Sequence, residues 1–460
     1  MAYATTNPYT NETLATFAEI GDEELDRAIG TAHATFESWR TKSFDERGRV
    51  VRRAAQILRD RPDDFARLLT LEMGKLFEES RGEVELAASI LDYYADNAEE
   101  FLAPERVATE DPQAGEAVVV SDPIGVLFGV QPWNFPYYQL ARFAAPNLMA
   151  GNVVMVKHAS IVPQSAAAFG SLFREAGAPE GAYTNVYANK DQVTRAIRDP
   201  RVRGVALTGS EGAGASVAAQ AGEELKKSTL ELGGSDALIV LGDADLDVSV
   251  ERALSGRLNN AGQSCVAAKR IIVVKEVADD FLRRFAEGFA RLRAGDPFDS
   301  ATTLPPLSSQ SAADDLQELV DEAEEHGATV VTPGDPVPEE GAFAQPRIIT
   351  GLTRDNPVYD KEFFGPVALF FRAEDEEDAV RIANDSTFGL GGSVFTEDIA
   401  RGAEVARRID TGMVFVNHPT LTRPSLPFGG TKRSGYGEEL SAAGIQEFVN
   451  KKLINVMPTG

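Results

Sequence analysis

The chain has 460 residues, of which 43% are hydrophobic and 25% are charged, which is typical of a folded globular protein with two or three domains. Acidic residues outnumber basic ones by 71 to 45, and the net charge of −26 argues against a nucleic-acid partner because phosphates would be repelled. No apolar stretch reaches the ~18 residues of a membrane helix, and no secretory signal is visible, so we expect a cytoplasmic protein.

The distribution of charge suggests the cellular environment. The acidic residues are spread over predicted helices rather than gathered in a tail, and arginine greatly exceeds lysine. Such a surface suits a salt-rich cytosol, in which counterions screen the repulsion between like charges. We therefore predict a halophilic source.

The first part of the chain is predicted to be helical over residues 22–102. Apolar residues recur there at three- and four-residue steps, as on one face of a helix. In the first helix these are Leu25, Ile29, Ala32, Phe36 and Trp39. Between Pro104 and Pro123 the pattern changes, because EAVVVSDP follows the turn-rich DPQAG and predicts a hairpin.

From residue 125 onward, apolar runs alternate with helical segments. GVLFGV, NVVMVK, GVALTG and DALIVL form one series, and RIIVVK, PRIIT, PVALFF, GGSVF and MVFVN form another, with helices near 279–293 and 375–384. This alternation predicts two α/β units with parallel sheets, which meet near Glu231. The last apolar strand, FVNKKLINV, has no local partner, so it either completes a sheet or pairs with another subunit.

The segment 259–270, NNAGQSCVAAKR, contains the only cysteine, Cys265. A free cysteine is often simply a small buried hydrophobic residue. Because one cysteine cannot form an intrachain disulfide, Cys265 serves either packing or chemistry.

Polar segments follow several of the predicted strands. They are PWNFP (132–136), VKHAS (156–160), LTGSEGAG (207–214) and LELGGS (230–235). Taken singly, each has an ordinary explanation: an aromatic turn, a solvated lysine, a glycine-containing turn and an ion-pairing glutamate. The glycines at 209, 212 and 214 do not match the dinucleotide fingerprint, although such a strand-to-helix turn still offers backbone N–H groups to a phosphate.

Taken together and in order, these segments with GQSC, EFFGP (362–366) and PFGGTKRSGYG (427–437) resemble the NAD(P)-dependent aldehyde dehydrogenase superfamily over effectively the whole chain. KHAS and ELGGSDALIV are most similar to its succinate-semialdehyde dehydrogenase branch. The resemblance implies an α/β fold with a Rossmann-type NAD(P)-binding domain, an α/β catalytic domain and a small β oligomerisation element. The three parts would cover residues 1–102 and 125–232, residues 233–427, and residues 103–124 and 428–460, respectively.

The resemblance also implies a homo-oligomer, either a dimer or a tetramer. In it the C-terminal strand would bind across a subunit boundary, as the hairpin near 103–124 does in the family. An apolar strand without a local partner would otherwise be an aggregation hazard.

The resemblance implies catalytic roles for three residues. Cys265 would attack the aldehyde carbonyl, because a nucleophile must make that carbon tetrahedral before hydride can leave. Asn134 and the backbone N–H of Cys265 would stabilise the oxyanion of the thiohemiacetal. After hydride transfer to NAD or NADP, Glu231 would activate the water that hydrolyses the thioester. No metal site is expected.

Cofactor residues carry over in the same way. Lys157 would bond the ribose, Gly209 and Ser210 would lie near the pyrophosphate, Glu362 would hold the nicotinamide ribose, and Trp133 and Leu232 would flank these groups. Many NAD-preferring relatives carry glutamate where this chain has Ser160, so we expect NADP to be accepted. Glu439 matches a family position near the proton exit route.

The substrate class rests on Arg142, eight residues after Asn134 on the next predicted helix. It could be an ordinary surface arginine, but relatives that oxidise succinate semialdehyde use this position for the substrate carboxylate. A second arginine of some relatives is Asn259 here, and Arg423 is a candidate replacement. Alternative substrates are 2,5-dioxopentanoate, glutarate semialdehyde and general aliphatic aldehydes. Glu231 argues against a CoA-acylating enzyme, and the intact set of Cys265, Glu231 and Asn134 argues against a silent structural homologue.

Overall fold

The computed structural model describes residues 3–108 and 115–457. It begins with an antiparallel hairpin of β1 (Tyr3–Asn7) and β2 (Glu12–Phe17), which the sequence pattern did not predict. The predicted helical region is confirmed as α1 (Asp22–Trp39), α2 (Phe44–Asp60), α3 (Pro62–Met73) and α4 (Phe77–Phe101). The five apolar residues assigned to the first helix face are all buried.

The first large sheet has six strands in the order β19-β9-β8-β5-β6-β7, and only β19 is antiparallel to its neighbour. Its strands are β5 (Val126–Gln131), β6 (Val153–His158), β7 (Tyr183–Asn185), β8 (Val202–Thr208), β9 (Lys227–Glu231) and β19 (Gly435–Tyr436). Its helices are α5 (Pro136–Ala150), α6 (Pro163–Glu175), α7 (Lys190–Arg198) and α8 (Glu211–Glu223). The chain runs outward from β5 to β7 and then returns to β8 on the other side of β5, so the strand order reverses between β5 and β8. Ligands of such sheets bind at the carboxyl ends of the strands flanking this point.

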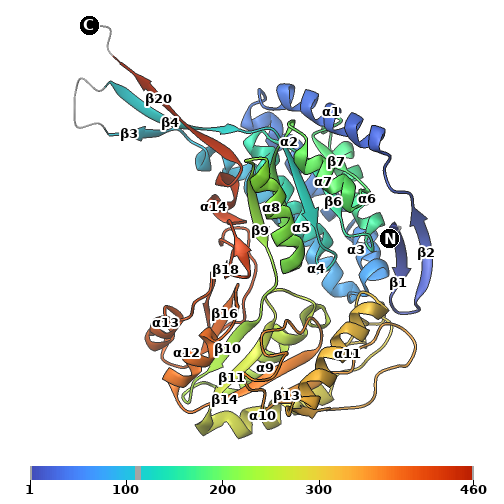
Figure 1. Cartoon of the computed structure of the whole chain (residues 1–460), viewed down its shortest axis with the longest axis vertical. Helices are drawn as coiled ribbons and strands as arrows, with labels where there is room; N and C mark the ends of the chain where they lie inside the picture. Colours follow the sequence, from blue (N-terminus) through green and yellow to red (C-terminus); the bar gives the residue numbers. More distant parts are fainter. Residues whose placement is uncertain (1–2, 109–114, 458–460) are drawn as a thin grey trace.

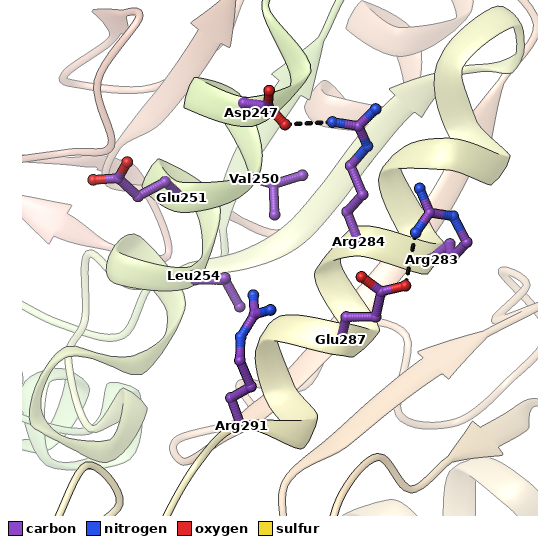
Figure 2. A pocket seen from close by; sticks show the side chains of 8 residues that line it. All are labelled: Asp247, Val250, Glu251, Leu254, Arg283, Arg284, Glu287 and Arg291. Carbon is purple, nitrogen blue, oxygen red and sulfur yellow. Dashed lines mark hydrogen bonds and ion pairs between the residues drawn. The ribbon is translucent and has the colours of Figure 1, made fainter. Parts of the chain in front are cut away.

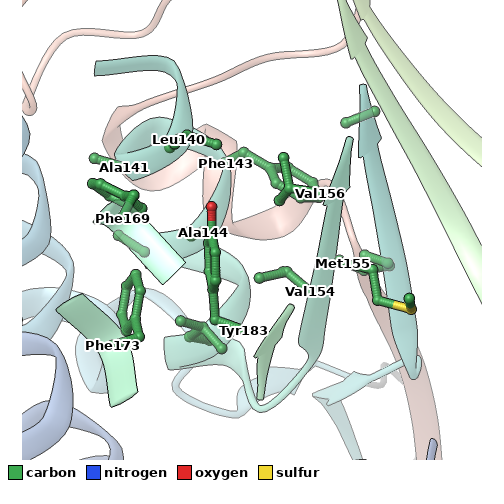
Figure 3. Close-up of a cluster of buried hydrophobic side chains, with 14 of the residues drawn as sticks. Leu140, Ala141, Phe143, Ala144, Val154, Met155, Val156, Phe169, Phe173 and Tyr183 are labelled. Carbon is green, nitrogen blue, oxygen red and sulfur yellow. The ribbon is translucent and has the colours of Figure 1, made fainter. Parts of the chain in front are cut away.

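The core of this part lies between the sheet and helices α5 and α6 (Figure 3). The labelled residues come from α5, α6, β6 and β7: Leu140, Ala141, Phe143, Ala144, Phe169, Phe173, Val154, Met155, Val156 and Tyr183. Phe173 stacks on Tyr183 with ring centroids 5.0 Å apart. A β-carbon on Gly129 of β5 would lie 2.6 Å from the Phe143 ring, so glycine at this position lets α5 pack directly on the sheet.

The second large sheet has seven strands in the order β12-β13-β14-β11-β10-β16-β17, and only β12 is antiparallel. Its strands are β10 (Asp236–Val240), β11 (Ala268–Val274), β12 (Thr329–Val331), β13 (Arg347–Thr350), β14 (Val367–Ala373), β16 (Gly392–Phe395) and β17 (Phe415–Val416). Its helices are α9 (Leu246–Leu258), α10 (Lys275–Ala290), α11 (Gln310–Glu325), α12 (Glu376–Asn384) and α13 (Ile399–Ala406). The α/β fold class and its two parallel sheets are therefore confirmed, whereas α13 was not predicted.

A three-stranded sheet forms an arm that projects from the body (Figure 1). It contains β3 (Glu105–Val107), β4 (Glu116–Pro123) and β20 (Val449–Val456) in the order β20-β4-β3. The predicted hairpin is confirmed by the β3–β4 pairing, although most of the DPQAG turn lies outside the described residues. Of the two alternatives for the last strand, completion of a sheet is confirmed, because β20 pairs with β4 along its whole length. The two strands are far apart in the sequence, so a local pattern could not reveal the pairing.

Short elements connect these parts. They are a 3-10 turn (Asn259–Gly262), a two-stranded pairing of β15 (Phe388–Gly389) with β18 (Thr431–Lys432), and α14 (Ser441–Gln446). Among the helices that the structure describes, none is long and apolar enough to cross a membrane.

Candidate active site

The two large sheets are joined by a four-residue crossing that brings Glu231 and Cys265 together. Strand β9 ends at Glu231 and β10 begins at Asp236. A β-carbon on Gly234 would clash with the carbonyl oxygen of Cys265, and one on Gly233 would lie 2.6 Å from Oε2 of Glu362. The glycines of ELGG therefore let the crossing pass directly against the cysteine loop.

The loop before Cys265 is fixed by hydrogen bonds to the turn that follows β5. Asn260 adopts a left-handed conformation with φ of 54°, and its Nδ2 donates to the carbonyl oxygen of Asn134 at 2.9 Å. Nδ2 of Asn134 in turn donates to the carbonyl oxygen of Gln263 at 3.1 Å. Glu79 of α4 accepts from the backbone N–H of Asn260 at 3.1 Å. The oxyanion candidate and the nucleophile candidate are thus held by one hydrogen-bonded unit.

Asn134, Arg142 and Cys265 line a common cavity of about 280 Å³. Its other polar lining residues include Tyr138, Ser255, Asn259, Ser264, His418, Thr420 and Thr422. Asn134 and Arg142 are buried, whereas Cys265 is partly exposed and open to a substrate. Arg423 is exposed and is not among the lining residues, so the structure does not bring this predicted substrate residue to the cavity.

Helix α5, which carries Arg142, is anchored from the helical layer below it. It has no side-chain cap of its own, and Oε1 of Glu83 on α4 accepts from the backbone N–H groups of Tyr137 at 2.8 Å and Tyr138 at 3.2 Å. Glu83 also forms a buried ion pair with Lys75. A carboxylate at a helix N-terminus satisfies otherwise unpaired donors and complements the helix dipole. Sequence reasoning missed this support, because neither Lys75 nor Glu83 belongs to a recognisable motif.

The environment of Cys265 favours the neutral thiol. Burial raises the pKa of Cys265 to about 12. The positive charges of Arg142 and Lys269 oppose this effect, and the negative charges of Glu362 and Glu231 reinforce it. Lys269 is fully buried and donates to the carbonyl oxygens of Ser264 at 2.6 Å and Cys265 at 3.0 Å. Its ammonium also pairs with Glu362 Oε1 at 3.0 Å. Sequence reasoning did not assign a role to Lys269, although it lies only four residues after the cysteine.

Glu231 is a buried carboxyl group without a hydrogen-bond partner for either oxygen within the described residues. Burial raises its pKa well above the usual range, the negative charge of Glu439 raises it further, and Arg142 lowers it. Glu439 itself forms a buried ion pair with Arg142. A carboxyl group with a raised pKa accepts a proton more readily than an ordinary glutamate, which suits a general base.

Arg142 has partners on all three of its nitrogens. Besides the ion pair of Nε with Glu439, Nη1 donates to Tyr138 Oη at 2.8 Å and Nη2 donates to Thr208 Oγ1 at 3.2 Å. The guanidinium also lies over the ring of Phe428, 4.7 Å from its centroid. The alternative of a solvated surface arginine is therefore excluded, because Arg142 is 2% exposed.

A second cavity of about 1080 Å³ lies beside the six-stranded sheet. It is lined by three of the predicted cofactor residues, Lys157, Ser160 and Ser210, and Ser210 caps the N-terminus of α8. Lys190, which the sequence reasoning missed, also lines it and lowers the pKa of Lys157 after the larger effect of burial. Two acidic residues, Glu19 and Asp191, contribute to the same wall.

The remaining predicted cofactor residues lie outside the lining of that cavity. Trp133 packs edge-on against Phe364, with ring centroids 5.7 Å apart. Leu232 is buried against Gly214 of α8, and Gly209 donates its backbone N–H to the carbonyl oxygen of Glu231. Glu362 accepts from the backbone N–H of Gly234 at 3.1 Å. These four residues surround the crossing between the two sheets.

A third hollow of about 410 Å³ lies between α9 and α10 (Figure 2). Four of its charged side chains form two pairs, since Arg284 donates to Asp247 and Arg283 donates to Glu287. None of the predicted site residues lines this hollow. The charges there are already compensated, so it is a weaker candidate for a ligand site than the two cavities above.

Comparison with known proteins agrees with the geometry of the site. A succinate-semialdehyde dehydrogenase of Deinococcus radiodurans, named for NADP(+), is 50% identical over 99% of this chain and 95% of that protein. The corresponding Mycobacterium tuberculosis protein is 44% identical over 99% of each chain. The crystal structure of succinic semialdehyde dehydrogenase from Streptococcus pyogenes, in complex with NADP(+), has a TM-score of 0.97 and 46% identity, and covers 99% of this chain and all of its own. The aldehyde dehydrogenase family matches residues 1–454, and the chain belongs to that family.

Proposed function

We propose that this enzyme oxidises succinate semialdehyde to succinate with NADP as the hydride acceptor. The observation that carries the proposal is the small cavity in which Cys265, Asn134 and the buried cation Arg142 meet. Relatives that are 44–50% identical over the full chain are named for this substrate and this cofactor, which supports both parts of the proposal.

In the proposed reaction Cys265 loses its proton and its sulfur attacks the aldehyde carbon, forming a thiohemiacetal. Nδ2 of Asn134 and the backbone N–H of Cys265 donate to the resulting oxyanion, and removing one such donor costs about 3–4 kcal/mol. When NADP is bound it would accept the hydride, and loss of that hydride from the thiohemiacetal carbon would leave a thioester on Cys265. Glu231 then takes a proton from the water that hydrolyses the thioester, and its raised pKa favours acceptance of that proton.

The cavity of about 1080 Å³ beside the six-stranded sheet, called the cofactor cavity below, suits an adenosine 2′-phosphate. Two lysine ammonium groups, Lys157 and Lys190, and the hydroxyl of Ser160 line it, and no carboxylate stands at position 160 to repel a phosphate. Two helix N-termini border the same space through their caps, Asn189 of α7 and Ser210 of α8. Backbone N–H groups at helix N-termini bind phosphate oxygens. We assign the nicotinamide ribose to Glu362 and the region of the sheet crossing.

For the substrate, Arg142 supplies a positive charge at the wall of the cavity, and Ser255, His418, Thr420 and Thr422 supply polar groups. Because Arg142 also pairs with Glu439, its positive charge is partly compensated, and it attracts a substrate carboxylate less strongly than an unpaired arginine would. Asn259 also lines the cavity, but its amide donates to Glu79 at 3.1 Å. A charged hydrogen bond contributes about 1.5–3 kcal/mol, or roughly 10- to 150-fold in binding.

We further propose that the enzyme is a cytoplasmic homo-oligomer. Leu453, Ile454, Val456 and Met457 on the arm are exposed apolar residues, and β20 is an edge strand of the described sheet. An apolar sheet edge of this kind favours pairing with another chain.

One experiment tests the substrate and cofactor together. Formation of reduced nicotinamide is measured with NADP and NAD, for succinate semialdehyde, 2,5-dioxopentanoate and uncharged butanal. We expect kcat/KM for succinate semialdehyde to exceed that for butanal by at least about tenfold, and Ser160→Glu to reduce the use of NADP. Equal kcat/KM values for butanal and succinate semialdehyde would refute the hypothesis that the cavity binds a substrate carboxylate. Undiminished use of NADP by Ser160→Glu would refute the hypothesis that Ser160 permits the 2′-phosphate.

A further inference from the structure

The N-terminal hairpin forms part of the wall of the cofactor cavity. Figure 1 shows β1 and β2 on the flank of the body next to α3. The backbone N–H of Ala4 donates to the carbonyl oxygen of Ser160 at 3.0 Å. Tyr3 of β1 and Glu19, just after β2, are among the residues that line the cavity. A segment that carries none of the recognised motifs therefore contacts the loop that contains Ser160.

A buried hydrogen-bond network attaches this hairpin to the start of α6. Thr5 Oγ1 donates to Oε1 of Glu72 at 2.6 Å and accepts from Nε2 of Gln164 at 2.9 Å. Glu72 also accepts from the backbone N–H groups of Gln164 and Ser165, each at 2.8 Å. The same carboxylate thus caps α6 and holds β1, so the hairpin and the Ser160 loop form one rigid unit.

Tyr3 makes two contacts that bear on the cavity. Its side chain is 2% exposed, and its hydroxyl donates to the carbonyl oxygen of Ala188 at 2.8 Å. The ammonium of Lys157 lies over its ring, 5.6 Å from the centroid. An aromatic face attracts a cation without neutralising it, unlike a carboxylate. Lys157 is therefore held in place while its full charge stays available to an anionic ligand.

We propose that Tyr3 is a positioning residue that sets the preference for a 2′-phosphate, by holding Lys157 against the cavity wall beside Ser160. This inference rests on the proposed NADP-dependent function. The ring is the essential part, because it faces the ammonium, whereas the hydroxyl anchors Tyr3 to the backbone at Ala188.

The test measures binding of cofactor fragments by isothermal titration calorimetry. The readout is the ratio of the Kd of 5′-AMP to that of 2′,5′-ADP, which isolates the contribution of the 2′-phosphate. We expect Tyr3→Leu to lower this ratio by about 2- to 30-fold, the range of a partly buried cation–π contact. Tyr3→Phe keeps the ring and should retain the wild-type ratio. Tyr9→Leu is the matched control, because Tyr9 lies in the same hairpin but packs against Phe343, away from the cavity.

Each outcome decides the inference. An unchanged ratio in Tyr3→Leu overturns it, as does equal weakening of 5′-AMP and 2′,5′-ADP, which would indicate a merely structural role. If Tyr3→Leu does not fold, Tyr3→Met takes its place, since methionine fills irregular space. A wild-type enzyme that binds 2′,5′-ADP no more tightly than 5′-AMP would instead refute the proposed NADP function itself.

Discussion

The ion pair between Arg142 and Glu439 is expected to make a large and measurable contribution to stability. Both side chains are buried, with exposed fractions of 2% and 8%. Removing one partner of such a pair costs about 3–5 kcal/mol, because the other charge is left buried without compensation. Arg142→Met should fall at the upper end of this range, since Tyr138 and Thr208 also lose a donor. Glu439→Gln should fall at the lower end, because the amide oxygen still accepts from the guanidinium.

The double variant Arg142→Met/Glu439→Gln distinguishes this explanation from two independent effects. Removing both charges leaves neither uncompensated, so the double variant should be more stable than the sum of the two single losses predicts, by about 3 kcal/mol. Urea denaturation followed by tryptophan fluorescence measures this, since buried Trp39 reports on the helical layer of the same half of the molecule. Arg52→Met with Asp96→Asn is a matched control, as that pair lies at the surface and should contribute less than about 1 kcal/mol. If the stability lost in the double variant equals the sum of the two single losses to within about 0.5 kcal/mol, the reasoning is refuted.

Two further predictions concern the chemistry of Cys265. Glu231→Gln should slow hydrolysis of the thioester more than hydride transfer, so stopped-flow absorbance should show a burst of reduced nicotinamide and then a slow steady state; equal slowing of both phases would remove Glu231 from the role of base. Because burial raises the pKa of Cys265 to about 12, the thiolate is the minor form at neutral pH, and the rate of alkylation by iodoacetamide without ligands should rise about tenfold per pH unit well beyond pH 9. Glu362→Gln should increase that rate at a given pH, since the negative charge of Glu362 raises the thiol pKa, whereas an alkylation rate that levels off below pH 9 would contradict the assignment.

The fold class could be predicted from the sequence because its signals are local. The helical face of α1 and the alternation from β5 onward are periodic patterns that a window of ten or twenty residues reveals. The hairpin β1–β2 was not predicted, because its burial comes from contacts with residues such as Tyr187 and Gln164, far along the chain. The partner of β20 could not be named for the same reason, because β4 lies far from it in the sequence.

In the candidate site, too, residues in local sequence motifs could be predicted, whereas residues that depend on distant contacts could not. Cys265, Asn134 and Arg142 lie in short motifs or at fixed spacings from them, and the structure places them around one cavity. Lys269 and Lys190 belong to none of the motifs. Lys269 is recognised only from its ion pair with Glu362, and Lys190 only from its place in the wall of the 1080 Å³ cavity. Arg423 was chosen because its loop, TLTRPSLPFGG (420–430), matches a loop near the substrate tunnel of the family, but its side chain is exposed.

The long-range pairing of the arm has a consequence for how the chain folds as it is synthesised. Strand β4 leaves the ribosome long before β20, and β9 leaves long before β19, which pairs with it at Glu231. Until β19 and β20 emerge, the nascent chain must therefore carry β4 and the edge of β9 without these partners. Unpaired strand edges of this kind favour misfolding and are natural targets for chaperones. The active site of a growing chain is thus completed only after residues 435–436 have been synthesised, when β19 pairs with β9 at Glu231.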